Sequence, residues 1–233
     1  MEGRSELAIE TAREIDRMNK HKNLAEGKRF SPLLILTLAR FGKWDEVQKQ
    51  PKPPIDQLFA LAMFHYARGM AHAAKLEFEA SQRELNALSQ IAANPKINAL
   101  DQQFPLPSAQ LILLGKHVLT GELAARRGQT SDMKQQFTTA IQLEDKLPYM
   151  EPPYWHHPAR QLYGAALLQA GKAAEAESVY REDLKRNPAN GWSLYGLLAS
   201  LRAQGESEEA RAVEKRFREA WRLADITLTA SRF

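Results

Sequence analysis

The sequence predicts an all-helical protein built from repeated helix pairs. Helix-forming residues (alanine, leucine, glutamate, glutamine, lysine and arginine) dominate the chain. Alternation of β-branched and polar residues, which a half-buried strand requires, is almost absent. Short helical stretches are separated by turns that contain glycine, or by proline with asparagine. These observations favour a series of short helices over any fold that contains a sheet.

An internal repeat of 34 residues lies in the last third of the chain. Gly171 and Gly205 are separated by 205 − 171 = 34 residues, and Ala176 and Ala210 by 210 − 176 = 34. A tight turn between two antiparallel helices needs a residue that tolerates a positive φ, which glycine does. The two helices approach closely only where small side chains meet. The spacing therefore predicts a helix–turn–helix repeat.

The repeated positions resemble the tetratricopeptide repeat. In one repeat, the helix contact, the turn, the small residue of the second helix, its aromatic residue and the break that follows are Gly164, Gly171, Ala176, Tyr180 and Pro188. The next repeat departs from the pattern, because Glu214 stands where an aromatic residue is expected. We expect Ala176 and Tyr180 to be buried between helices.

The resemblance implies a right-handed α-solenoid of about five helix pairs. Its turns are expected at five glycines: Gly42, Gly69, Gly128, Gly171 and Gly205. Residues 1–29 are expected to form the second helix of an incomplete repeat, and 30–110 irregular repeats. Residues 111–157 are expected to hold a repeat and an insertion rich in proline and aromatic residues. Two repeats with a C-terminal capping helix are expected over 158–233, the last helix over 206–228 and a frayed end after it.

Composition excludes several classes of protein. The net charge is +4, and the cationic residues are interspersed with acids, which is typical of solvated helix surfaces and not of a nucleic-acid-binding face. No apolar run approaches the ~20 residues that cross a bilayer, so no membrane insertion is expected. The chain has no cysteine, which excludes disulfides and fits the cytoplasm; a periplasmic location also fits if the chain is a fragment.

No motif for catalysis, cofactor binding or metal binding is evident. Neither a glycine-rich phosphate loop nor a nucleophile elbow occurs. His156 and His157 are adjacent, and neighbours on a helix point about 100° apart, which makes a poor chelate. His65 and His72 flank an expected turn, where packed side chains are the simpler interpretation. We expect no enzyme and no cofactor; a metal-binding or enzymatic module built on 147–158 is the alternative.

The resemblance further implies that the first helices of the repeats line a concave groove that binds a peptide or partner protein. Aromatic residues and arginine are the usual anchors of binding surfaces. The candidate partner-binding residues are Phe59, Tyr66, Arg126, Tyr154, Trp155, Gln161, Trp192, Tyr195 and Arg202. For each aromatic residue, packing between repeats is the alternative.

The segment 147–158 is the most distinctive stretch, with four prolines and three aromatic residues. Its prolines forbid a continuous helix. We expect it to fold back over the groove near Trp192 and Tyr195; the alternative is that its rings fill a gap between neighbouring repeats. A different functional hypothesis is an architectural region of a larger protein, or a homodimer formed through the incomplete N-terminal repeat.

Overall fold

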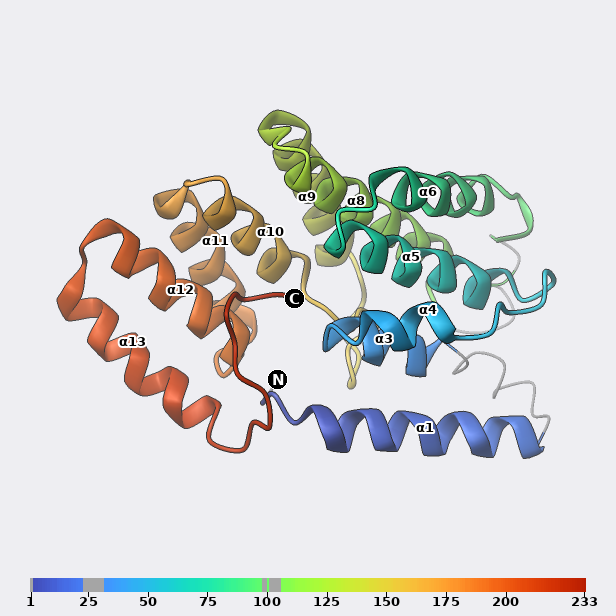
Figure 1. Ribbon diagram of the computed structural model, residues 1–233, viewed down its shortest axis with the longest axis horizontal. Coiled ribbons are helices and arrows are strands. Elements are labelled where there is room, and N and C mark those ends of the chain that lie inside the picture. The colour runs from blue at the N-terminus through green and yellow to red at the C-terminus, as the bar shows by residue number, and fades with distance from the viewer. Residues whose placement is uncertain (1, 23–31, 98–99, 101–105) are drawn as a thin grey trace. The chain divides into compact units, whose positions relative to one another are not determined.

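The computed structural model describes residues 2–22, 32–97, 100 and 106–233. Parts of the predicted segments 1–29 and 30–110 lie outside these residues. The described residues contain no strand, and their helices are α1 (Ser5–Lys22), α3 (Leu33–Arg40), α4 (Trp44–Lys49), α5 (Leu58–Ala74), α6 (Phe78–Ala92), α8 (Ser108–Arg126), α9 (Thr130–Asp145), α10 (Ala159–Gln169), α11 (Ala173–Arg186), α12 (Gly191–Gln204) and α13 (Ser207–Ala220) (Figure 1). The predicted all-α class is confirmed.

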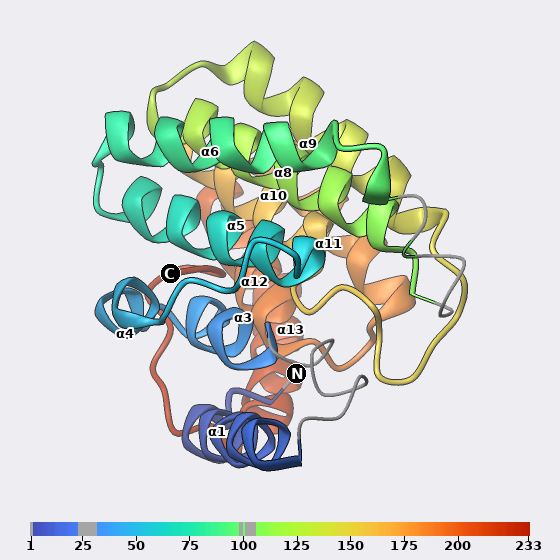
Figure 2. The ribbon, with the colours of Figure 1, turned by 90° about the vertical axis from the view of Figure 1, so that its right-hand side faces the viewer.

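The chain divides into two compact units. Unit 1 comprises Met1–Leu7 and His157–Phe233, and unit 2 comprises Ala8–His156. In unit 2, α3 packs on α4, α5 on α6 and α8 on α9, and α8 also packs on α5 and α6 (Figure 2). In unit 1, α10, α11, α12 and α13 each pack on the next. From α3 to α9 in unit 2, and from α10 to α13 in unit 1, each described helix therefore packs on the next described helix.

Four of the five predicted turns are confirmed. Gly42, Gly128, Gly171 and Gly205 have φ values of 65°, 73°, 70° and 80°. A Cβ atom at Gly128, Gly171 or Gly205 would meet nothing within 4 Å. The backbone conformation, and not lack of space, is therefore what requires glycine at these turns.

The turn predicted at Gly69 is wrong. Gly69 lies inside α5, and the turn after α5 falls at Leu76, which has a φ of 61°. A Cβ atom on Gly69 would overlap the side chain of Leu119 from α8. Gly69 thus allows α5 and α8 to approach closely, and it does not form a turn. With the corrected turn, the first two turns are also 34 residues apart, because 76 − 42 = 34.

A common register becomes visible once Leu76 replaces Gly69 as the turn. Five residues after each turn lies a buried side chain: Val47, Ser81, Met133, Ala176 and Ala210. Seven residues before the turn, Gly69, Gly121 and Gly164 occupy equivalent positions, since 76 − 69, 128 − 121 and 171 − 164 all equal 7. The described helix pairs therefore share one packing pattern despite unequal spacing.

Aromatic rings fill the space that two of these glycines leave. A Cβ atom on Gly121 would lie 2.9 Å from Phe137 Cδ2, and one on Gly164 would lie 2.5 Å from Tyr180 Cζ. Phe137 and Tyr180 both stand nine residues after their turn (137 − 128 = 9; 180 − 171 = 9), and both are fully buried. The predicted burial of Tyr180 and of Ala176 is confirmed.

The last helix is shorter than predicted. Helix α13 ends at Ala220, eight residues before the predicted boundary. The ring of Trp221 stacks on Phe217 with centroids 5.7 Å apart, and it lies against Gly3 and Gly191, where a Cβ atom would overlap it. The helix therefore ends immediately before a packed ring. Residues 226–233 do not fray: Leu228, Ser231 and Arg232 are buried.

The N-terminus of α1 is held by a residue far along the chain. The carboxylate of Asp225 accepts hydrogen bonds from Ser5 N (2.7 Å), Ser5 Oγ (2.7 Å) and Glu6 N (2.8 Å). These bonds satisfy amide groups that a helix N-terminus leaves without intrahelical partners. Burial opposes ionisation of Asp225, but the hydrogen bonds from Glu6 and Ser5 outweigh it and lower its pKa.

Among the described helices, none combines the length and the apolar character needed to cross a bilayer.

The helix contact at Gly164 can be tested directly. We expect Gly164→Ala to lower the free energy of unfolding by about 1–3 kcal/mol, because overlap with Tyr180 outweighs the helix propensity of alanine. Urea denaturation followed by circular dichroism is the measurement. Gly171→Asn is the matched control, since its φ is 70° with open space around it and asparagine tolerates that conformation. A larger loss in the control than in Gly164→Ala would contradict the assignment.

Candidate functional site

Unit 1 buries an unusual group of polar side chains. They come from α10, α11, the α11–α12 turn, α12 and the last residues of the chain: Gln161, Asp183, Asn190, Ser193 and Ser231. Burying a polar group is unfavourable unless a hydrogen bond replaces its water. Each of these five residues makes such a bond, and together they form a connected hydrogen-bond network.

Asp183 organises the turn between α11 and α12. Its Oδ2 accepts hydrogen bonds from Asn190 Nδ2 (2.9 Å) and Ser193 Oγ (2.6 Å), and its Oδ1 accepts one from Asn187 Nδ2 (3.0 Å). Asn190 is also the N-cap of α12, because its Oδ1 accepts a bond from the Trp192 amide at 3.3 Å. The carboxylate and the cap together fix where α12 begins.

Gln161 connects this network to the last residues of the chain. Its Oε1 accepts a hydrogen bond from Asn190 Nδ2 at 3.3 Å, so its amide NH2 is turned away from the network. That NH2 group donates to His157 Nε2 at 2.9 Å and to the main-chain carbonyl of Ser231 at 2.9 Å. Gln161 therefore binds backbone, through an amide whose orientation is set by its neighbours.

Residues 226–233, which we call the return segment, lie against this part of unit 1. Figure 1 draws the segment in red, leaving the end of α13. It is not helical, and Trp221 Nε1 donates to the carbonyl of Ile226 at 3.1 Å. The hydroxyl of Ser231 is hydrogen-bonded to that of Tyr180, whose burial raises its pKa and keeps it protonated.

The last two residues of the return segment each meet a side chain from the first helix of a pair. Arg232 donates a hydrogen bond to Gln169 Oε1 on α10. The ring of Phe233 packs edge-on against Trp192 on α12, with centroids 5.2 Å apart. We call the surface formed by Gln161, Gln169, Tyr180 and Trp192 the first-helix face; Tyr180 reaches it from α11.

Four of the predicted partner-binding residues belong to unit 1, and the structure brings two of them together. Gln161 and Trp192 lie beneath the return segment, and both are buried. Tyr195 packs instead against Phe217 of α13 (5.5 Å), and Arg202 pairs with Glu214 of α13 (2.9 Å). Tyr195 and Arg202 thus belong to the α12–α13 contact.

The other predicted residues belong to unit 2. Tyr66 and Trp155 are buried against each other, with ring centroids 5.3 Å apart. Phe59, Arg126 and Tyr154 are half-buried, and Arg126 pairs with Glu122 at 2.8 Å. Two of these five thus help to form the packed interior of their unit, and a partner-binding role for them stays a prediction.

The proline-rich insertion is packed at one end and exposed at the other. Trp155 lies 3.2 Å from the position that a Cβ atom on Gly115 would take, and its ring is 5.0 Å from that of His156. Tyr149 is 88% exposed. Desolvation and the charge of Arg40 lower the pKa of His156 to about 3. The predicted position of 147–158 near Trp192 and Tyr195 stays a prediction.

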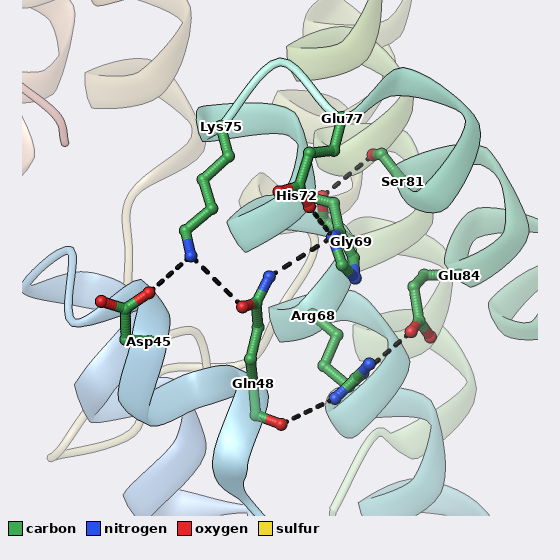
Figure 3. Close-up of polar contacts among 9 residues, drawn as sticks. All are labelled: Asp45, Gln48, Arg68, Gly69, His72, Lys75, Glu77, Ser81 and Glu84. Atoms are coloured by element: carbon green, nitrogen blue, oxygen red, sulfur yellow. Dashed lines mark hydrogen bonds and ion pairs between the residues drawn. The ribbon is translucent and has the colours of Figure 1, made fainter.

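A second polar cluster joins α4, α5 and α6 in unit 2 (Figure 3). Arg68 donates to the carbonyl of Gln48 (2.9 Å) and to Glu84 (2.8 Å), and His65 donates to the same carboxylate at 2.6 Å. Burial opposes ionisation of Glu84, but the bonds from His65 and Arg68 outweigh it and lower its pKa. These contacts hold α4 and α6 against α5.

The two histidines near the predicted turn have separate partners. His72 pairs with Glu77 at 2.5 Å, whereas His65 pairs with Glu84. Lys75, in the turn between α5 and α6, bonds to Asp45 at 2.5 Å. Within the part of the chain that the structure describes, no three histidine or acidic side chains are grouped so as to hold a metal ion.

Comparison of the chain with protein-family models, with curated proteins and with solved structures found no match.

The packing of His156 predicts a pH dependence of stability. The pKa of a free histidine is about 6.5, so as the pH falls the unfolded chain binds a proton before the folded chain does. The neutral His156 ring therefore makes its full contribution to the free energy of unfolding above the free-histidine pKa. This contribution is lost as the pH falls from there towards about 3, the pKa in the folded chain. The His156→Phe variant keeps a ring at this position but has no group there that titrates. Between pH 7 and pH 5 we expect its free energy of unfolding to fall by about 1–2 kcal/mol less than that of the wild type. Denaturant unfolding at both pH values is the measurement.

A ring-proton titration by NMR gives an independent readout. A His156 signal that titrates near the free value would show that the ring is solvated and would contradict the packed assignment.

Proposed function

We propose that the chain is a non-enzymatic binding module, similar to tetratricopeptide-repeat proteins, that holds a non-helical segment of a protein or peptide partner on the first-helix face of unit 1. One observation carries the proposal: this face already holds a non-helical segment of its own chain. The contact uses the main chain, through Gln161 and the Ser231 carbonyl at 2.9 Å. A side-chain amide that binds a carbonyl accepts many sequences, which suits a peptide-binding surface.

The face is preorganised in a way that favours binding. Asn190 bonds to both Gln161 and Asp183, so the orientation of the Gln161 amide does not depend on the segment it holds. Trp192 is fixed by its edge-on contact with Trp221, with ring centroids 5.4 Å apart. Groups that are already ordered lose little conformational entropy on binding.

A second candidate function, an architectural role through α1, is favoured by a different observation. Leu7 and Met18 are each 49% exposed. They stand eleven residues apart (18 − 7 = 11), which places them on the same side of a helix. Exposed apolar side chains aligned along a helix suit a helix–helix contact, including one between two copies of the chain. Light scattering of the wild type and of Leu7→Glu with Met18→Glu separates the two hypotheses, because only the architectural role requires a dimer that the charges disrupt.

The peptide-binding proposal is tested by selection and mutation. Octapeptides that bind the purified chain are selected from a random displayed library, and their affinities are measured by fluorescence anisotropy. We expect Gln161→Ala to lower the affinity for the selected peptides by about tenfold or more. The reason is that the variant loses a buried hydrogen bond between uncharged groups, and a factor of ten in affinity corresponds to about 1.4 kcal/mol.

Gln135→Ala is the matched control, since Gln135 is an exposed glutamine on α9 in the other unit. Thermal melting of both variants is followed in parallel, so that loss of binding is distinguished from loss of fold. Peptides that bind a melt-stable Gln161→Ala chain as well as they bind the wild type would place the binding surface elsewhere.

A further inference from the structure

The return segment occupies the side chains that the proposed function needs. Gln161 is bonded to Ser231 O, Gln169 to Arg232, Tyr180 to Ser231 Oγ, and Trp192 is covered by Phe233. A partner on the first-helix face has to contact these same groups. Binding of a partner and retention of residues 226–233 are therefore mutually exclusive at this face.

The chemistry of the contact is concentrated in three consecutive residues. Ser231 supplies a hydroxyl, Arg232 a cation and Phe233 an aromatic ring. On the first-helix face, their respective partners are the Tyr180 hydroxyl, the Gln169 amide oxygen and the Trp192 indole. The residues just before them are less engaged, since Thr227, Thr229 and Ala230 are exposed and only Leu228 is buried. The first-helix face thus recognises a hydroxyl, a cation and an aromatic ring on three consecutive residues.

The segment is held by interactions that suit reversible binding. The polar contacts described above join the Arg232 cation to the uncharged Gln169 Oε1, the hydroxyls of Ser231 and Tyr180 to each other, and the Gln161 amide to the Ser231 carbonyl. None of these three joins two opposite charges, and in each case water or a competing segment can replace the partner. The return segment has no helical structure of its own to lose. Residues 221–225 hold it next to the face through the contacts of Trp221 and Asp225, so a partner in solution has to compete with an intramolecular contact.

We propose that residues 226–233 act as an internal competitor for the first-helix face, and that the partner of this face presents a hydroxyl, a cation and an aromatic ring at consecutive positions. This inference rests on the proposed function and adds the regulation of the site and the chemistry of its ligand. The apparent affinity of the chain for such a partner is low, because the partner binds only after it has displaced the return segment.

The test uses the full chain and a labelled peptide with the sequence of residues 226–233, Ile-Thr-Leu-Thr-Ala-Ser-Arg-Phe. Arg232→Ala with Phe233→Ala weakens the internal competitor and leaves the first-helix face intact. We expect this double variant to bind the peptide at least tenfold more tightly than the wild type in anisotropy titrations. Thr229→Ala, at an exposed position of the same segment, is the matched control and is expected to bind as the wild type does.

A second measurement does not depend on a destabilising variant. The chain has no cysteine, so Thr229→Cys carries a single spin label on the return segment. Excess unlabelled peptide is expected to increase the mobility of this label. Peptides in which the serine is replaced by valine, the arginine by glutamate or the phenylalanine by alanine are expected to have a smaller effect at the same concentration.

The outcomes separate this inference from the proposed function. Equal peptide affinity of the wild type and the double variant overturns internal competition, and leaves the proposed function to the independently selected octapeptides. A label that stays immobile at saturating peptide identifies residues 226–233 as a fixed part of the fold, and this also overturns the inference. Light scattering that shows a dimer for the wild type and a monomer for the double variant assigns the segment to a neighbouring copy, and overturns competition within one chain.

Discussion

The position of the Tyr180 ring constrains most of unit 1. The ring lies between Gly164 of α10 and Gly196 of α12, and a Cβ atom at either glycine would overlap it. One side chain from α11 therefore sets how closely three helices approach. Its hydroxyl is bonded to Ser231. Because protein interiors are close-packed, the helix spacing and the place of the return segment are coupled through this residue.

The sequence revealed the packing pattern but not the role of every glycine. The spacing of Gly171 and Gly205 and the small residue Ala176 led to the correct helix pairs in the last third of the chain. Gly69 was misassigned because a turn glycine and a helix-contact glycine look alike in sequence. The true turn, at Leu76, carries a residue for which a positive φ is uncommon. Only the position of Leu119 on a later helix shows why Gly69 is glycine.

The candidate site was predictable in part. Gln161 and Trp192 were identified from positions on the first helices, and both lie on the first-helix face. Asp183 and Ser231 were both missed. The partners of Asp183 lie only four to ten residues further along the chain, at Asn187, Asn190 and Ser193, but the role of Ser231 comes from hydrogen bonds to residues distant in sequence. Ser231 is 70 residues from Gln161 and 51 from Tyr180. Residues 226–233 mix four apolar and four polar residues without helical periodicity, so local composition does not show which of them are buried.

The bond between Asp225 and the start of α1 has a consequence for biosynthesis. Ser5 and Asp225 are 220 residues apart in the chain, so at ribosomal rates of 5–20 residues per second the acceptor is made roughly 10–45 s after the donor. Until then the first turn of α1 has no carboxylate cap, and Gly3 has no indole to cover it. Unit 2, from Ala8 to His156, is translated entirely within that interval. Ser5 and Glu6 are thus made before the whole of unit 2, yet they reach their native contacts with Asp225 only after it.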